Sequence, residues 1–182
     1  MKKEKIILGI DPGTNIMGYG VIKKTNKKIE FLCFDVILLK KFDNHHLKLK
    51  KIFKKTSEII QSFSPDEIAI EAPFFSNNAQ SMLKLGRAQG AAIIASVMHN
   101  IPIIEYAPKK IKLAITGRGQ ASKEQVAGML TNMLSIKEQP KYLDATDGLA
   151  AAVCHALQNE NLITNKKTSW SQFVKNNPNR IQ

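Results

Sequence analysis

The sequence predicts an α/β domain in which a mixed five-stranded sheet is flanked by helices. Three apolar runs near the N-terminus are joined by turn residues and predict an antiparallel meander. The chain then alternates short strands with helices, which adds βα units to the sheet. A chain of 182 residues is long enough for one domain with a substantial core. We expect residues 1–160 to form this domain and the basic residues 161–182 to be a flexible C-terminal tail.

The meander is predicted from residues 5–10, 16–23 and 29–38. The first run is almost entirely branched and apolar, which is typical of a buried strand. Asp11 stands where this run stops. The following Pro12-Gly13 forces a turn, because proline fixes φ and glycine accepts a positive φ. The pattern therefore places an acidic side chain at a rigid strand end.

The rest of the chain alternates helices and strands. The pattern predicts helices over 44–63, 77–100, 108–115, 123–134 and 143–159, and strands over 67–72 and 102–106. The second half of helix 77–100 has almost no polar face, so this helix must be buried on two sides. In a single domain of this size, we expect a subunit interface on its second side. Small residues that would permit close approach there are Gly86, Ala88, Gly90, Ala91 and Ala92.

The net charge of +12 favours a polyanionic partner, and nucleic acid before a membrane. The basic residues are 24 Lys and 3 Arg, and such a lysine excess can also reflect a coding bias. The lysines of helix 44–63 are best interpreted as a solvated face. No apolar run is long enough to span a membrane, and the N-terminal run is too short for a signal peptide, so we expect a cytoplasmic protein.

Cysteine and histidine do not form a metal-binding or nucleophilic pattern. Cys33 and Cys154 each lie in an apolar stretch and are expected to be core residues in a reducing compartment. His155 lies within a predicted helix, where a structural role is expected. His45 and His46 lie in a lysine-rich segment and are expected to be exposed.

Four carboxylates lie at the ends of predicted elements. Asp11 and Glu71 end two core strands, and Asp144 and Asp147 share one face near the start of the last helix. Carboxylates gathered in one place raise one another's pKa, and they stay ionised together only when cations neutralise them. Oxygen ligands of this kind suit Mg²⁺ or Mn²⁺, and two such ions can act on a phosphodiester.

Each carboxylate also has a simpler interpretation. Asp11 could only nucleate the turn, Glu71 could face solvent, and Asp144 and Asp147 could favour the helix dipole. All of these would have to hold at once, and the basic character of the chain would then stay unexplained. Phe74 follows the second of these strands in a connecting loop, where it could fill the core or stack on an unpaired base.

Taken in order, these residues resemble the RuvC family of Holliday junction resolvases over roughly residues 5–157. The motifs that carry the resemblance are Gly9-Ile10-Asp11-Pro12-Gly13, Gly18-Tyr19-Gly20, Ile70-Glu71, Leu85-Gly86, Tyr106-Ala107-Pro108 with Lys112, Gly117, Gly119, Ala121, Lys123, Gln125-Val126, and Asp144-Ala145-Thr146-Asp147 running to His155. Each fragment is common, but the ordered set is specific to that family.

The resemblance implies a ribonuclease H-like nuclease domain that resolves four-way DNA junctions by paired symmetric nicks. It implies that Asp11, Glu71, Asp144 and Asp147 hold two Mg²⁺ ions per subunit, with Asp11 between them and Mn²⁺ as a substitute. It further implies that Lys112 and Lys123 contact DNA phosphates and that Phe74 contacts a junction base. Family members are homodimers through the helix at 77–100, and they work with the RuvA–RuvB branch-migration complex.

The sequence departs from the family pattern at several positions. The usual Gly-x-Ala-Arg-Gly of the second helix is here Gly86-Arg87-Ala88-Gln89-Gly90, which moves the arginine two places back. Some relatives have histidine at the position of Asp144. Gly148 replaces a usual alanine inside a helix, at a cost of about 1 kcal/mol.

Two other functions fit parts of the sequence. An actin-like ATPase also has Asp-x-Gly-Thr after a strand, but that fold needs a second such loop and a longer chain. A junction-binding module without catalysis would explain the charge, but phosphate binding gains nothing from clustered carboxylates.

Overall fold

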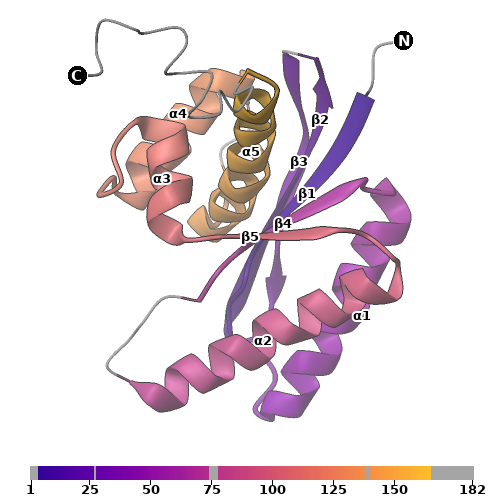
Figure 1. Ribbon diagram of the computed structural model, residues 1–182. Helices are drawn as coiled ribbons and strands as arrows, with labels where there is room; N and C mark the ends of the chain where they lie inside the picture. Colours follow the sequence, from indigo (N-terminus) through magenta and orange to yellow (C-terminus); the bar gives the residue numbers. More distant parts are fainter. Residues whose placement is uncertain (1–3, 27, 74–77, 138–139, 165–182) are drawn as a thin grey trace, which may run out of the picture.

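A computed structural model describes residues 4–26, 28–73, 78–137 and 140–164 of the chain. It has three layers, with a central sheet, the helices α1 and α2 on one face, and α3, α4 and α5 on the other (Figure 1). Within the described ranges, no helix is long and apolar enough to cross a membrane. Phe74 and residues 165–182 of the expected tail lie outside these ranges.

The sheet has five strands in the order β3-β2-β1-β4-β5. The first three, β1 (Glu4–Asp11), β2 (Ile16–Thr25) and β3 (Lys28–Leu38), pair antiparallel. The last two, β4 (Glu67–Glu71) and β5 (Ile103–Tyr106), extend the sheet with parallel pairs. The predicted mixed sheet, a meander followed by βα units, is thus confirmed.

The helices are α1 (His45–Phe63), α2 (Ala79–Met98), α3 (Pro108–Thr116), α4 (Lys123–Leu134) and α5 (Leu143–Thr164). Asn44, Asn78 and Ser122 cap the first, second and fourth by accepting hydrogen bonds from main-chain N–H groups. Helix α2 therefore begins two residues later than predicted. Helix α5 continues to Thr164, so the predicted helix end at 159 is too early.

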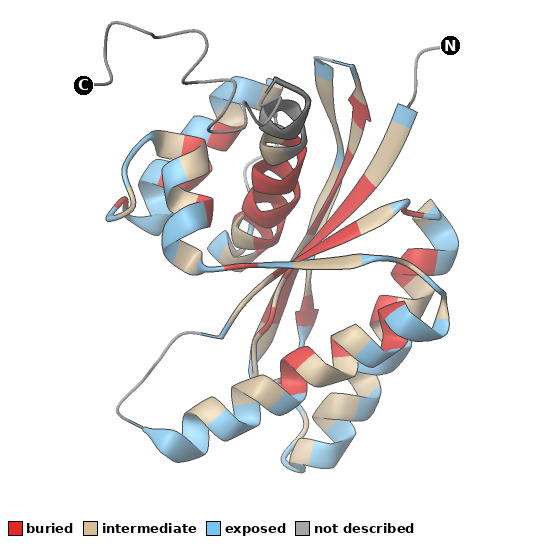
Figure 2. Cartoon of the chain, in the orientation of Figure 1, coloured by how far each residue is buried: buried red, intermediate tan, exposed pale blue. Residues whose placement is uncertain are grey.

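The core is divided by the sheet into two apolar layers. Alternation along β1 sends Leu8 and Ile10 toward α1 and α2, whereas Ile7 faces the layer that contains α5. In β4, Ile70 likewise faces α1 and α2, and Ala69 faces the layer that contains α5. Figure 2 shows buried residues along the central strands and on helices of both flanking layers, with a long buried run on α5. This alternation decides which way the side chains at the strand ends point.

Helix α5 lies directly against the backbone of β1 and β2. A Cβ atom added at Gly148 would lie 2.5 Å from the Cα of Tyr19, and one added at Gly20 would lie 2.5 Å from the Cα of Leu149. A methyl group at either position would push the helix off the sheet. In this chain the glycine at position 148 leaves room for this contact, and its low helix propensity is the cost of the close approach.

We predict that Gly148→Ala lowers the free energy of unfolding by about 1–3 kcal/mol, because the new methyl group overpacks the contact with Tyr19. Gly128, on the exposed face of α4, is the matched control, because a Cβ atom added there would meet nothing within 4 Å. Gly128→Ala should stabilise the protein by up to about 1 kcal/mol. Urea unfolding of both variants measures the difference, and equal effects of the two substitutions would contradict the packing argument.

Candidate active site

Two of the four carboxylates come from adjacent parallel strands. β1 and β4 pair in register, with Ile10 opposite Ile70, so Asp11 and Glu71 follow side by side at the same edge of the sheet. Side chains alternate along a strand, so Asp11 lies on the same face of the sheet as Ile7, and Glu71 on the same face as Ala69. Ile7 and Ala69 both face α5. The two acidic side chains therefore point toward the layer that contains α5.

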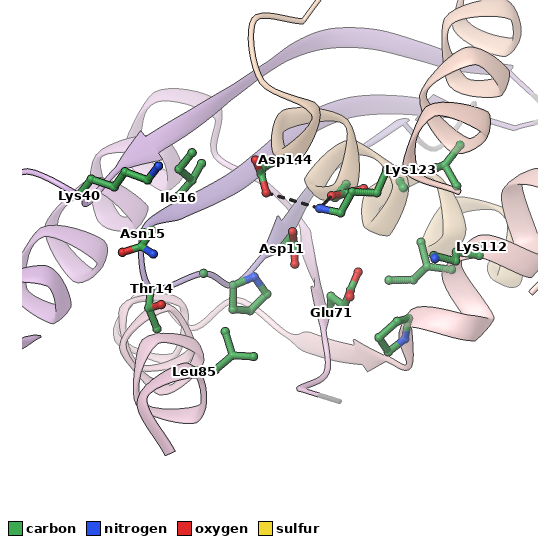
Figure 3. Close-up of a pocket in the computed structure, with 17 residues that line it drawn as sticks. Asp11, Thr14, Asn15, Ile16, Lys40, Glu71, Leu85, Lys112, Lys123 and Asp144 are labelled. Carbon is green, nitrogen blue, oxygen red and sulfur yellow. Dashed lines mark hydrogen bonds and ion pairs between the residues drawn. The ribbon is translucent and has the colours of Figure 1, made fainter. Parts of the chain in front are cut away.

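The other two carboxylates come from the first two turns of α5. Asp144 and Asp147 are three residues apart and lie on one face of the helix. Carboxylate oxygens of Asp11, Asp144 and Asp147 lie within 4.8 Å of one another. Figure 3 shows Asp11 between Asp144 and Glu71, and all four residues line one pocket of about 640 Å³. The predicted convergence of the four carboxylates is thus present in the structure.

Burial and mutual repulsion make these groups hard to ionise. Burial raises the pKa of Asp11 well above its ordinary value, and the charges of Glu71 and Asp147 raise it further. Burial and the charge of Asp147 raise the pKa of Glu71 from 4.5 to about 7. A divalent cation in the pocket would oppose both effects, because it neutralises the repulsion and replaces lost hydration.

Among the described residues, Lys123 forms ion pairs with two members of the cluster. Its ammonium group forms an ion pair with Asp147 and lies 3.5 Å from Asp144 (Figure 3). Burial lowers the pKa of Lys123, but the contacts with Asp147, Asp11 and Asp144 outweigh burial and raise it overall.

Other basic groups surround the pocket. Lys112 on α3 lines it, as the sequence led us to expect for a residue near the site. Lys40, which follows β3, lines the opposite side, and no motif in the sequence points to it. Lys48 donates hydrogen bonds to the main-chain oxygen of Thr14, at 3.0 Å, and to Oδ1 of Asn15, at 3.1 Å. It thereby holds the turn that follows Asp11, a contact between distant segments that no local pattern indicates.

Histidine and cysteine lie apart from the carboxylate cluster. His155 is buried, its Nδ1 is 2.7 Å from the hydroxyl of Tyr106, and its Nε2 is 2.8 Å from Oε2 of Glu67. The expected structural role of His155 agrees with these contacts. Cys154 is buried and Cys33 partly buried, and both are free thiols. His46 is exposed as expected, whereas His45 is partly buried.

The chain is similar to proteins of one family. Residues 7–155 match the family model of the crossover junction endodeoxyribonuclease RuvC. The protein of that name from Christiangramia forsetii is 58% identical over 183 residues, covering 100% of this chain and 95% of the relative. The one from Bacteroides fragilis is 57% identical, covering 99% of this chain and 97% of the relative.

A solved structure agrees with these matches. Thermus thermophilus RuvC in complex with a Holliday junction substrate superposes with a TM-score of 0.80 at 30% identity. The match covers 86% of this chain and 96% of the other. The yeast mitochondrial Holliday junction resolvase Ydc2 shares the fold, with a TM-score of 0.66 at 14% identity.

We predict that Mg²⁺ stabilises the protein more at pH 8 than at pH 6. In the folded protein the pKa of Glu71 is raised from 4.5 to about 7. Without metal, protonated Glu71 therefore contributes its full share to the free energy of unfolding below pH 4.5, and this contribution is lost as the pH rises to about 7. A Mg²⁺ ion held by these carboxylates would compete with protons for them, so it would bind more tightly once Glu71 has lost its proton. Thermal unfolding with and without Mg²⁺ at both pH values measures this. Glu71→Gln is the control, and a Mg²⁺ shift independent of pH would contradict the prediction.

Proposed function

The chain belongs to the RuvC family of crossover junction endodeoxyribonucleases, and we propose that its four converging carboxylates hold two Mg²⁺ ions for the hydrolysis of DNA phosphodiesters. It is an endonuclease that resolves four-way (Holliday) junctions in recombination and repair. Membership in this nuclease family also implies the use of a divalent metal. The alternative of an actin-like ATPase is wrong, because the family match covers most of the chain.

The observation that carries the metal proposal is the acidic cluster formed where the edge of the sheet meets the first turns of α5. Asp11, Asp144 and Asp147 present only carboxylate oxygens, which suit a hard divalent cation such as Mg²⁺ and also Mn²⁺. Asp11, Asp144 and Asp147, together with Glu71 in the same pocket, would hold the ions. Bound there, the two ions would supply an activated water and neutralise charge on the leaving oxygen.

The protein's own basic residues bind and orient the DNA strand. Lys112 and Lys123 flank the carboxylates and are proposed to contact the phosphates on either side of the scissile bond. When the metal ions are bound, Lys123 no longer has to neutralise Asp147 and is free to bind a phosphate. Phe74 lies outside the described residues, and its proposed contact with a junction base rests on the family resemblance.

The outer face of α2 supports a homodimer. Leu83, Ile94, Val97 and Met98 are 62%, 54%, 53% and 69% exposed, an apolar surface that a solvated helix would not carry. A Cβ at Gly86 or at Gly90 would meet nothing within 4 Å, so another helix could approach closely there. Ala88 and Ala92 are buried within the subunit instead, so the expectation that they face a partner is wrong.

A two-fold dimer supplies two equivalent active sites, as paired symmetric nicks require. From the family resemblance, we also propose that the protein works with the RuvA–RuvB branch-migration complex and that it is located in the cytoplasm. A junction-binding module without catalysis is the second candidate function. It would bind junctions in low salt without a response to Mg²⁺, and it would leave the DNA uncut.

We predict that Asp147→Asn lowers Mg²⁺-dependent nicking of a synthetic four-way junction by at least ~100-fold. Loss of a residue that only hydrogen-bonds to a metal ligand can already lower activity by up to about 100-fold, and Asp147 is proposed to be a ligand itself. Junction binding should persist, because the substitution leaves the surrounding lysines in place. Unsubstituted protein should give paired nicks at symmetric positions only with Mg²⁺. Tight binding without nicking by the unsubstituted protein would favour the binding module, and equal cutting of duplex DNA would indicate a general nuclease.

We predict that Ile94→Glu or Met98→Glu converts the dimer to a monomer, because a charge on the exposed apolar face of α2 would be buried without a partner. Analytical ultracentrifugation measures the change. Leu47→Glu on α1, where the leucine is 50% exposed, is the matched control and should stay dimeric. A monomeric unsubstituted protein, or dissociation by the control, would contradict an interface on α2.

A further inference from the structure

Gln89 is a buried polar residue on the inner face of α2, only 7% exposed. Its side-chain amide Nε2 donates a hydrogen bond to Oε2 of Glu105, at 2.7 Å. The same nitrogen lies 3.5 Å from the main-chain oxygen of Glu71. One amide therefore contacts the strand that ends in Glu71 and the neighbouring strand, β5.

These contacts lie at the end of β4, where Glu71 joins the carboxylate cluster. Glu71 is the last residue of β4 and pairs with Tyr106, whose main-chain oxygen accepts a hydrogen bond from the N–H of Ala72 at 2.8 Å. Glu105, the acceptor for Gln89, is paired with Ile70, one residue before Glu71. Gln89 thus contacts the last paired residues of β4 and β5 from the side of the sheet that α2 covers. The side chain of Glu71 points to the other side of the sheet, into the pocket (Figure 3).

The acceptor of the shorter hydrogen bond is the carboxylate of Glu105, a residue that is itself exposed. A donor to a carboxylate forms a shorter and stronger bond than a donor to a neutral acceptor. Because Gln89 is neutral, it can approach the carbonyl of Glu71 without adding charge next to the carboxylate cluster. Gln89 stands where the family pattern usually has arginine.

We propose that Gln89 is a positioning residue that holds the end of β4, and with it the carboxylate of Glu71, at the distance from Asp11 and Asp147 that catalysis requires. The opposite face of the same helix carries the exposed apolar residues Ile94 and Met98, so the contact also links the dimer helix to the active site. The inference rests on the proposed function, because it assigns Gln89 a part in the same reaction.

The test compares near-isosteric substitutions in the full-length protein. Gln89→Met removes the donors, and Gln89→Glu places a carboxylate against Glu105. We expect the single-turnover rate of nicking in the preformed junction complex to fall about 10-fold for Gln89→Met and further for Gln89→Glu, because small displacements of a reacting group are costly. The junction Kd, measured without Mg²⁺, and the dimeric state should not change. The Mg²⁺ concentration for half-maximal rate should rise.

The double variant Gln89→Glu with Glu105→Gln restores the pair with donor and acceptor exchanged, and it should recover part of the lost rate. Ser96→Ala is the control, since Ser96 is another buried polar residue of α2 and donates only within its helix, to Ala92. This control should cleave normally.

Normal single-turnover nicking by Gln89→Met would overturn the inference. So would a loss of rate that accompanies loss of the dimer or of junction binding, or a double variant no faster than Gln89→Glu. Failure of the unsubstituted protein to nick junctions would instead refute the proposed function.

Discussion

The direct contact between α5 and the first two strands is the constraint on which the active site depends. Asp144 and Asp147 sit on the first two turns of α5, and they can reach Asp11 only when that helix touches the sheet backbone. Glycines at 20 and 148 allow this contact, because neither has a side chain to hold the two backbones apart. A spacing set by ordinary side chains, ~10 Å between packed layers, would leave the acidic groups of the helix and the sheet too far apart to share an ion.

The closeness that serves catalysis is costly for the protein itself. Burial and repulsion raise the pKa values of Asp11, Glu71 and Asp147, so ionising all three groups together is unfavourable. Lys123 offsets part of this repulsion by pairing with Asp147. In the proposed function, metal ions and the lysine would be alternative neutralising charges for the same carboxylates, and a DNA phosphate would be the partner of the lysine once metal is bound.

Much of this arrangement could be predicted from the sequence, because it follows from local pattern. Asp11 and Glu71 each end an apolar run, and parallel strands bring such ends to one edge of a sheet. Asp144 and Asp147 stand at a spacing that places them on one helical face. The mixed sheet followed from short strands that first succeed one another directly and then alternate with helices.

The remainder depends on contacts between distant segments, which local patterns do not encode. Gly148 stands out in the sequence only for its low helix propensity, and the structure shows that Tyr19 leaves no room for a methyl group there. Lys48 and Gln89 are ordinary residues of two amphipathic helices until the fold places them beside the turn after Asp11 and the end of β4. The sequence pattern ends α5 too early, because the polar last turns of this helix resemble the tail that follows.

The central claim is that the four carboxylates form one centre for two divalent ions. The most direct test is a crystal structure of the protein grown with Mn²⁺, with anomalous data collected at the manganese edge. We predict two anomalous peaks ~3.5–4 Å apart, with Asp11 touching both and Lys123 displaced from Asp147. A single peak, or none within reach of Asp11 while Lys123 remains paired with Asp147, would contradict the account.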